Sequence, residues 1–376
     1  MTMSNDALSA SRFERLQALL RQDPGNERLL AECAEAALDE GRLDDAQAAL
    51  DRYAGAAEPS PQMRNLAALI AMQREDWAAA ADAYGSMMAE GVDAPPIRFG
   101  LAWALAMQRR FAEALPLIDE ATAAALPQAA ALLVQLLHDA GNMDEAAEQA
   151  HRLIALHPDH RALNAAVATL AIDIEDVELA RLCASRAGDH PDALNTLGTL
   201  ALGEDDGETA YRLFDGAVAR DRASPRGWVG RGLARLHGDP AAAATDIDRG
   251  AALFGDHLGS WIAAGWAHFI AGDAAAARDR FEKARAIDDN FAEAHGSLAV
   301  LDVLAGDLEI ARRRTETALR LDRQCFSAAL AATLIAAGGG DHAKAQRIFD
   351  MAINTPVDGG GRTIAQSLAR MGLRSG

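Results

Sequence analysis

The stretch WIAAGWAHFIAGDAAAARDRFEKARAI, residues 261–287, most constrains what this chain can fold into. Apolar and small residues recur every three to four positions in both of its halves, which indicates two amphipathic helices. Gly272, followed by an aspartate, ends the first helix and begins the second. Gly265 lacks side-chain bulk, so the helices can approach closely, while Trp261 and Phe281 fill the space beside it. The stretch therefore predicts an antiparallel helix pair.

Small residues that mark the second helix recur at a near-constant spacing along the chain. Ala46, Ala80 and Ala114 are each 34 residues apart, whereas Ala180 and Ala210 are only 30 residues apart. The remaining units are marked by Ala146, Ala244, Ala277, Ala311 and Ala345. One helix pair cannot bury its own apolar face, but stacked pairs can bury their faces against one another. The spacing therefore predicts a tandem array.

The order Trp, Gly four residues later, Gly-Asp, then Ala, Phe and Ala resembles a tetratricopeptide repeat, a helix-turn-helix unit of 34 residues. The resemblance covers roughly residues 27–356, as about ten units of uneven quality. The fifth unit is degenerate, with Glu175 where a turn glycine is usual, and Asp248 replaces a large apolar residue in a later unit. The family implies an all-α, right-handed α-solenoid, a superhelix of tandem antiparallel helix pairs.

The array divides into four predicted segments. These are an N-terminal tail and capping helix (1–26), an N-terminal sub-array (27–190), a C-terminal sub-array (191–356), and a C-terminal capping helix with its tail (357–376). The short spacing near 187–192 predicts either a kink between sub-arrays or only a trimmed loop. The capping helix is expected over 362–373, RTIAQSLARMGL, because terminal units need a distinct outer face. Pro116 lies inside a predicted helix and is expected to kink it.

Charge and cysteine usage limit the partners and the compartment. A formal net charge of −19 disfavours nucleic acid and anionic membranes, and it suits either a basic or amphipathic protein partner or simple solubility. Three widely spaced cysteines without a C-x-x-C pair indicate reduced, buried thiols. The first residues lack a basic region followed by an apolar run, and no apolar run approaches the length of a membrane span. We expect a cytoplasmic protein.

No stretch carries an enzymatic motif such as a phosphate-binding loop, a dinucleotide fingerprint or a nucleophile elbow. The glycine runs 338–340 and 359–361 are interpreted as flexible turns. His157-Pro158-Asp159-His160, with His151 before it, has the residue types of a metal site, but Pro158 falls at a break between repeats, which favours a structural role. An enzyme would need an additional domain. We therefore expect no catalytic activity, no cofactor and no metal.

The remaining candidate site is the inner face of the first helices. In proteins of the resembling family these helices line a concave groove, and ligand contacts come from the face opposite the Trp-Gly packing. The predicted partner-binding residues on that face are Val229, Leu233, Leu236, Ile262, Trp266, Phe269, Val300, Val303 and Leu304, with Phe99, Trp103 and Met107 in the first half. Alternatively, a tight superhelix or the chain's own terminal helix buries them. The family's Asn/Lys/Arg carboxylate clamp is not matched, because Asn195 is isolated.

These observations predict a scaffold, adaptor or chaperone that binds protein or peptide in its groove, preferring an amphipathic or basic segment. The alternative is a regulatory or accessory subunit of an enzyme or of a secretion or assembly machine. Neither the partner nor the oligomeric state follows from the residues.

Overall fold

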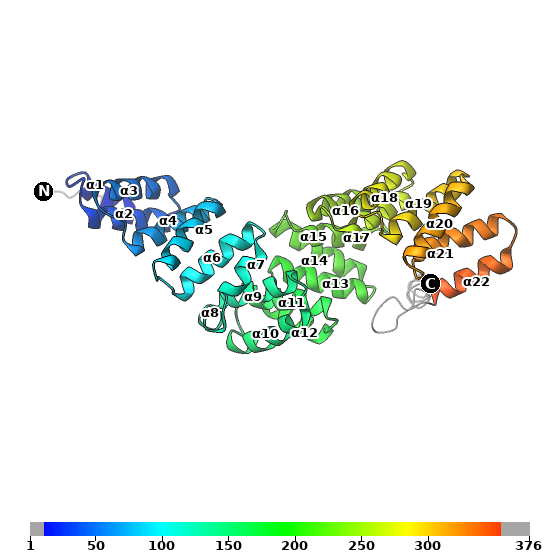
Figure 1. Cartoon of the computed structure of the whole chain (residues 1–376), viewed down its shortest axis with the longest axis horizontal. Helices are drawn as coiled ribbons and strands as arrows, with labels where there is room; N and C mark the ends of the chain where they lie inside the picture. Colours follow the sequence, from blue (N-terminus) through cyan, green and yellow to red (C-terminus); the bar gives the residue numbers. More distant parts are fainter. Residues whose placement is uncertain (1–10, 355–376) are drawn as a thin grey trace. The chain divides into compact units, whose positions relative to one another are not determined.

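The computed structural model describes residues 11–354, which form α-helices and one short 3-10 helix without any strand (Figure 1). The chain separates into two compact units, Met1–Leu170 (unit 1) and Ala171–Gly376 (unit 2). The all-α expectation is confirmed. The first residues of the predicted N-terminal tail and the predicted capping helix at 362–373 lie outside the described residues.

Unit 1 begins with a short helix and continues as helix pairs. Its helices are α1 (Arg12–Leu20), α2 (Glu27–Asp39), α3 (Leu43–Ala56), α4 (Pro61–Gln73), α5 (Trp77–Ala89), α6 (Pro95–Met107), α7 (Phe111–Ala114), the 3-10 helix η2 (Leu115–Leu117), α8 (Glu120–Ala125), α9 (Pro127–Asp139), α10 (Met143–Leu156) and most of α11 (Arg161–Asp173). The break after α7 contains Pro116, so the predicted kink is a complete interruption of the second helix. Proline has no backbone N–H to donate and its ring displaces the preceding turn.

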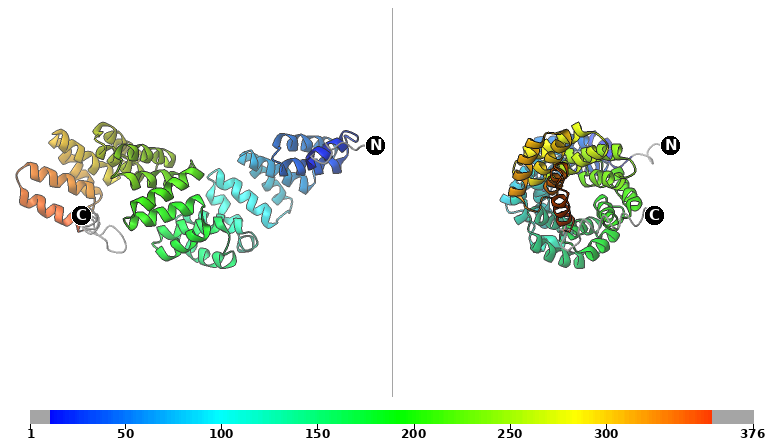
Figure 2. Two further views of the ribbon diagram at one scale, coloured as in Figure 1. Left: turned by 180° about the vertical axis from the view of Figure 1, so that it is seen from behind. Right: turned by 90° about the vertical axis from the view of Figure 1, so that its right-hand side faces the viewer.

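Unit 2 is more regular. Its helices are α12 (Val177–Ala187), α13 (Pro191–Gly203), α14 (Gly207–Arg220), α15 (Pro225–Arg235), α16 (Pro240–Phe254), α17 (Leu258–Ile270), α18 (Ala274–Ile287), α19 (Ala292–Ala305), α20 (Leu308–Leu321), α21 (Phe326–Gly338) and α22 (His342–Ile353). From α13 onward each helix packs against the next one along the chain, so that consecutive pairs stack (Figure 2). Each unit is therefore a solenoid of tandem helix pairs.

The turn inside each pair uses one recurring geometry. Gly272 has a φ of +86°, and the N–H of the following Asp273 donates to the carbonyl of His268, which closes the end of α17. The Asp273 carboxylate then accepts the N–H of Ala276 and caps α18. Glu175 adopts the same left-handed conformation, with a φ of +59°, where glycine was expected from the repeat. The Gly-Asp pattern thus ends one helix and starts its partner.

Glycine and an aromatic ring determine how closely the helices of a pair approach. A Cβ atom added to Gly265 would lie 2.2 Å from Cε1 of Phe281, and one added to Gly198 would lie 2.8 Å from Cζ of Phe214. Phe281 and the aligned alanine Ala277 are both fully buried. The predicted close contact between Gly265 and Phe281 is therefore present. Any side chain at Gly265 would have to displace the ring.

The compact units divide inside α11, between Leu170 and Ala171, whereas the sequence placed the division of its sub-arrays at 190/191. Cys33, Cys183 and Cys325 are free and buried. Burial raises the pKa of the Cys183 thiol to about 11 and that of Cys325 to about 12. These thiols are therefore packing residues and are not poised to react.

Candidate partner-binding site

Nine of the predicted partner-binding residues lie on three first helices of unit 2, α15, α17 and α19. We call them the apolar strip: Val229, Leu233, Leu236, Ile262, Trp266, Phe269, Val300, Val303 and Leu304. Their spacing of three to four residues within each helix puts each trio on one face, as the helical period requires. Corresponding positions, such as Trp266 and Val300, are one repeat apart and lie in the same phase. The other three predicted residues belong to unit 1.

Most members of the apolar strip are neither core nor fully exposed. Leu233 is 40% exposed and Leu304 is 58% exposed, whereas Val300 is only 2% exposed. The other six are half-buried. Val300 therefore supports the strip from beneath and offers almost no surface to a partner. The remaining residues keep accessible apolar area on an otherwise polar, charged molecule.

Trp266 is the residue that joins the strip together. Its ring makes edge contacts with Phe269 and Phe281, with ring centroids 5.6 Å and 5.4 Å apart. It also packs beside Val300, in the cluster formed with α21. Aromatic pairs in this arrangement contribute about 0.5–1.5 kcal/mol beyond the area they bury. Trp266 thus has a packing role as well as an accessible surface.

The structure adds two residues that were not predicted from the sequence. Leu330 and Leu334 of α21 are half-buried and pack in the same cluster as Trp266 and Val300. Trp266, Val300 and Leu334 are separated by 34 residues each, so the repeat period itself carries the signal. Extending the row by one further repeat would have found Leu334. The apolar surface therefore continues from α15 to α21.

The same first helices carry a row of charged residues that point toward the second helices. Arg235, His268 and Asp302 occupy equivalent positions in α15, α17 and α19. Asp302 is 2% exposed, and its carboxylate accepts from Arg278 Nη2 at 2.9 Å and from Arg314 Nη1 at 2.7 Å. Two guanidinium groups on α18 and α20 thus compensate this buried charge, as a buried carboxylate requires.

Asp248, the irregular residue of its repeat, has its own set of partners. Its carboxylate accepts from Arg280 Nε at 2.8 Å and Nη2 at 2.7 Å, and from His268 Nε2 at 2.8 Å. Burial by itself would raise the pKa of Asp248, but the hydrogen bonds from Arg280 and His268 outweigh it and hold the pKa below the usual aspartate value. The missing aromatic ring is thus replaced by a polar link among α16, α17 and α18.

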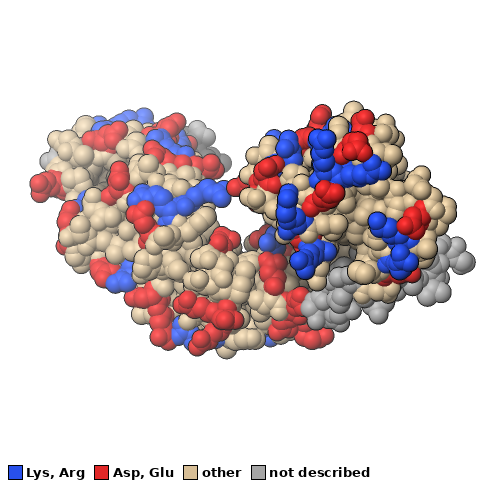
Figure 3. Space-filling model, turned by 45° about the vertical axis from the view of Figure 1, so that its right-hand side comes forward, with Lys and Arg blue, Asp and Glu red and all other residues tan. Residues whose placement is uncertain are grey.

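Electrostatic compensation is also visible on the molecular surface. Acidic and basic side chains are interspersed across the visible face in Figure 3, without a large area of one sign. This intermixing follows from ion pairs between neighbouring helices, such as Arg231 of α15 with Asp215 of α14 at 2.8 Å. The negative net charge is therefore distributed over the surface.

In unit 1, Phe99, Trp103 and Met107 lie on α6. The rings of Phe99 and Trp103 are 5.9 Å apart between centroids, and both residues are half-buried. Met107, at the end of the helix, is 47% exposed. This trio forms a second, smaller apolar surface that belongs to unit 1 alone.

The histidines considered as metal ligands have structural partners. His160 Nδ1 accepts the N–H of Leu163 at 3.2 Å and so caps α11. A ring nitrogen of His157 lies 3.1 Å from the carbonyl oxygen of Ala123. Within residues 11–354, no group of three or more His, Cys, Asp or Glu side chains is placed to hold a metal ion. Over the same range, no helix combines the length and apolar character needed to cross a bilayer.

The stacked pairs, their Gly-Asp turns and their glycine–aromatic contacts define an α-solenoid, a class of fold that generally serves as a non-catalytic scaffold. Two family models, both described as tetratricopeptide repeat, match residues 5–70 and 66–130. The chain is a tetratricopeptide-repeat protein. No curated protein sequence matches it significantly.

Solved structures share the fold at low sequence identity. A monomeric mutant of IFIT1 with Gppp-AAAA is 11% identical, with a TM-score of 0.53 over 87% of this chain and 90% of that one. The human IFIT1 dimer with m7Gppp-AAAA is also 11% identical, with a TM-score of 0.52 over 95% and 96%. A tetratricopeptide repeat protein from Parabacteroides merdae ATCC 43184 is 14% identical, with a TM-score of 0.43 over 64% and 98%. At such identities the likeness concerns the fold alone.

Proposed function

We propose that this chain is a protein-interaction scaffold whose unit 2 docks an apolar segment of a partner on the apolar strip. The observation that carries the proposal is the run of half-buried and exposed apolar residues, in constant phase, on the first helices of consecutive repeats. A solvated helix face would instead carry polar residues at those positions. The surrounding acidic surplus favours a partner segment with basic flanks.

The exposed area decides what kind of segment fits. Two fully accessible aromatic side chains bury about 300–500 Å² on binding, but Trp266 and Phe269 are already half-buried. Association costs about 4–15 kcal/mol, so two half-buried rings alone would bind weakly. The partner must therefore contact several repeats at once, as an amphipathic helix or an extended segment does.

The experiment is a quantitative pull-down with the full chain as bait and mass spectrometry as the readout. Trp266→Ala with Phe269→Ala removes the aromatic surface, and Leu233→Glu with Leu304→Glu places charge on the two exposed members. Leu253→Glu with Ile287→Glu is the matched control, because these residues are 45% and 39% exposed on second helices. We expect both strip variants to lose the partner at least about tenfold, while the control retains it.

The Leu233→Glu, Leu304→Glu variant is decisive because neither side chain belongs to a core cluster, so folding should survive. If this variant is folded and captures the same partner at wild-type strength, the strip is not the docking surface. One stoichiometric partner favours the accessory-subunit alternative, whereas many unfolded clients favour a chaperone. If the chain's own C-terminal segment occupies the strip, deleting residues 362–376 will raise the binding of a hydrophobic dye.

The proposal also includes a reducing compartment, the cytoplasm, and a partner other than nucleic acid. Three free, buried cysteines support the first point. The negative net charge supports the second, because nucleic-acid affinity depends on cationic contacts to phosphate. The IFIT1 structures with capped or uncapped AAAA ligands share only the fold, so RNA binding is tested directly. We expect no shift of a single-stranded RNA in a gel assay at physiological salt.

A further inference from the structure

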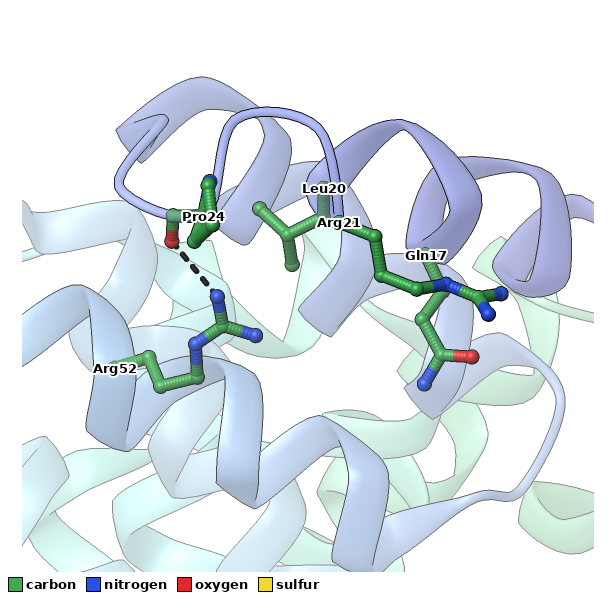
Figure 4. Close-up of a pocket in the computed structure, with 5 residues that line it drawn as sticks. All are labelled: Gln17, Leu20, Arg21, Pro24 and Arg52. Atoms are coloured by element: carbon green, nitrogen blue, oxygen red, sulfur yellow. Dashed lines mark hydrogen bonds between the residues drawn. The ribbon is translucent and has the colours of Figure 1, made fainter.

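A pocket of about 420 Å³ opens in unit 1 between the end of α1 and the helix α3 (Figure 4). Gln17 and Leu20 of α1, Arg21 and Pro24 of the turn that follows, and Arg52 of α3 line it. One water molecule takes up about 30 Å³ in the liquid, so the pocket accommodates a group of several heavy atoms. It belongs to a different unit from the apolar strip and is independent of the function proposed for that strip.

Two guanidinium groups in this pocket are not neutralised by the protein. Arg52 Nη2 donates to the carbonyl oxygen of Pro24 at 2.7 Å, which orients the group and leaves its other N–H donors available (Figure 4). Among residues 11–354, neither Arg21 nor Arg52 has a carboxylate partner. Many other arginines of unit 1 do have one: Arg12 with Asp39, Arg28 with Glu32, Arg42 with Asp45, Arg74 with Asp44, and Arg110 with Glu113.

This contrast is informative because the chain has 55 acidic residues for 36 basic ones. With acidic groups in excess, a surface arginine usually finds a carboxylate nearby, yet two arginines that share a pocket do not. The planar guanidinium fork matches the oxygen pairs of carboxylate and phosphate groups, and its charge strengthens those hydrogen bonds. Gln17 can donate a further hydrogen bond from its amide. Leu20 and Pro24 provide an apolar wall for the carbon skeleton that carries the anion.

We propose that this pocket binds a small organic anion, with its carboxylate or phosphate oxygens held by Arg21 and Arg52. The carbon skeleton of the ligand then lies against Leu20 and Pro24. The same chemistry serves a phosphate ester and a carboxylic acid, and the experiment distinguishes these two sources.

The test is isothermal titration calorimetry on the full chain with two probes, inorganic phosphate and succinate. The variants are Arg21→Gln and Arg52→Gln, and glutamine keeps a donor for the Pro24 carbonyl. Arg28→Gln is the control, because Arg28 is a surface arginine of unit 1 outside the pocket. We expect saturable binding of at least one probe, weaker at high salt, at least about tenfold weaker in each pocket variant and unchanged in the control.

The probe that binds more tightly identifies the anion class. Absence of saturable binding for both probes overturns the proposal. So does a pocket variant that keeps wild-type affinity, with circular dichroism confirming that it is folded. The Arg21→Gln variant keeps the test falsifiable even if Arg52→Gln disturbs the α1–α3 turn, because the Arg21 side chain makes no hydrogen bond within the described part of the chain.

Discussion

At the scale of single residues, the fold depends on where side chains are absent as much as on where they are present. Gly265 allows Phe281 to lie directly against the backbone of α17, and Gly198 does the same for Phe214 against α13. Where the aromatic residue is missing, at Asp248, a histidine and an arginine satisfy the carboxylate. Two kinds of local contact, one apolar and one ionic, therefore join neighbouring helices of the solenoid.

Gly265→Ala tests the apolar contact. The added Cβ would lie 2.2 Å from the Phe281 ring, so the ring or the helix must move, and overpacking of this kind costs about 1–3 kcal/mol. Gly203→Ala is the control, because Gly203 ends α13 with no heavy atom within 4 Å of its added Cβ. We expect a lower melting temperature only for Gly265→Ala. Equal melting temperatures for the two variants would show that the assigned helix register is wrong.

Asp248→Asn tests the ionic contact through its pH dependence. The folded-state pKa of Asp248 lies below its unfolded value of about 4, so the ionised carboxylate stabilises the fold above pH 4. That contribution is lost as the pH falls through the folded-state pKa. At neutral pH we expect Asp248→Asn to lower the free energy of unfolding by roughly 1.5–3 kcal/mol.

The difference between wild type and Asp248→Asn should shrink as the pH is lowered below about 4. Urea unfolding followed by circular dichroism across pH 3–7 measures it, with the exposed Asp256→Asn as control. A difference that stays constant over this range would mean that Asp248 contributes no charge-dependent stability.

At the scale of elements, the repeats differ in quality. The fifth unit, α11 and α12, has Glu175 in a left-handed conformation that costs a non-glycine residue about 1–2 kcal/mol. The division between the compact units also falls inside α11. Pairs such as α17–α18 have instead a turn glycine and a glycine–aromatic contact. Local stability should therefore vary along the array.

Amide hydrogen exchange measures this variation directly. We expect lower protection over residues 161–190 than over 258–288, because repeats gain stability mainly from their neighbours and a degenerate repeat weakens its own interfaces. Exchange followed by mass spectrometry resolves segments of this length. Equal protection in both ranges would contradict the expectation.

At the scale of the whole molecule, two compact units within one chain predict unfolding in more than one step. Differential scanning calorimetry of the wild type should show a calorimetric enthalpy larger than the van't Hoff enthalpy. Gly265→Ala should lower the temperature of one component, that of unit 2, and leave the other unchanged. A single transition with equal enthalpies, displaced as a whole by the substitution, would show that the units unfold together.

Much of this organisation could be predicted from the sequence. The helical class, the repeat spacing, the turn at Gly272 and the contact between Gly265 and Phe281 all follow from local periodicity, because each repeat packs only on its neighbours. The phase of the apolar strip follows for the same reason, and the same period would have located Leu334.

Only the tertiary structure decided which charges meet and how much surface remains accessible. Asp248 is bound by an arginine 32 residues further along the chain, and Val300 is buried while Leu304 is exposed. The pocket at Arg21 and Arg52 brings together a turn and two helices, and the division inside α11 reflects contacts summed over many residues. The physical reason is that periodicity specifies the face of a helix, whereas burial and ion pairing depend on which side chains of several helices converge at one point.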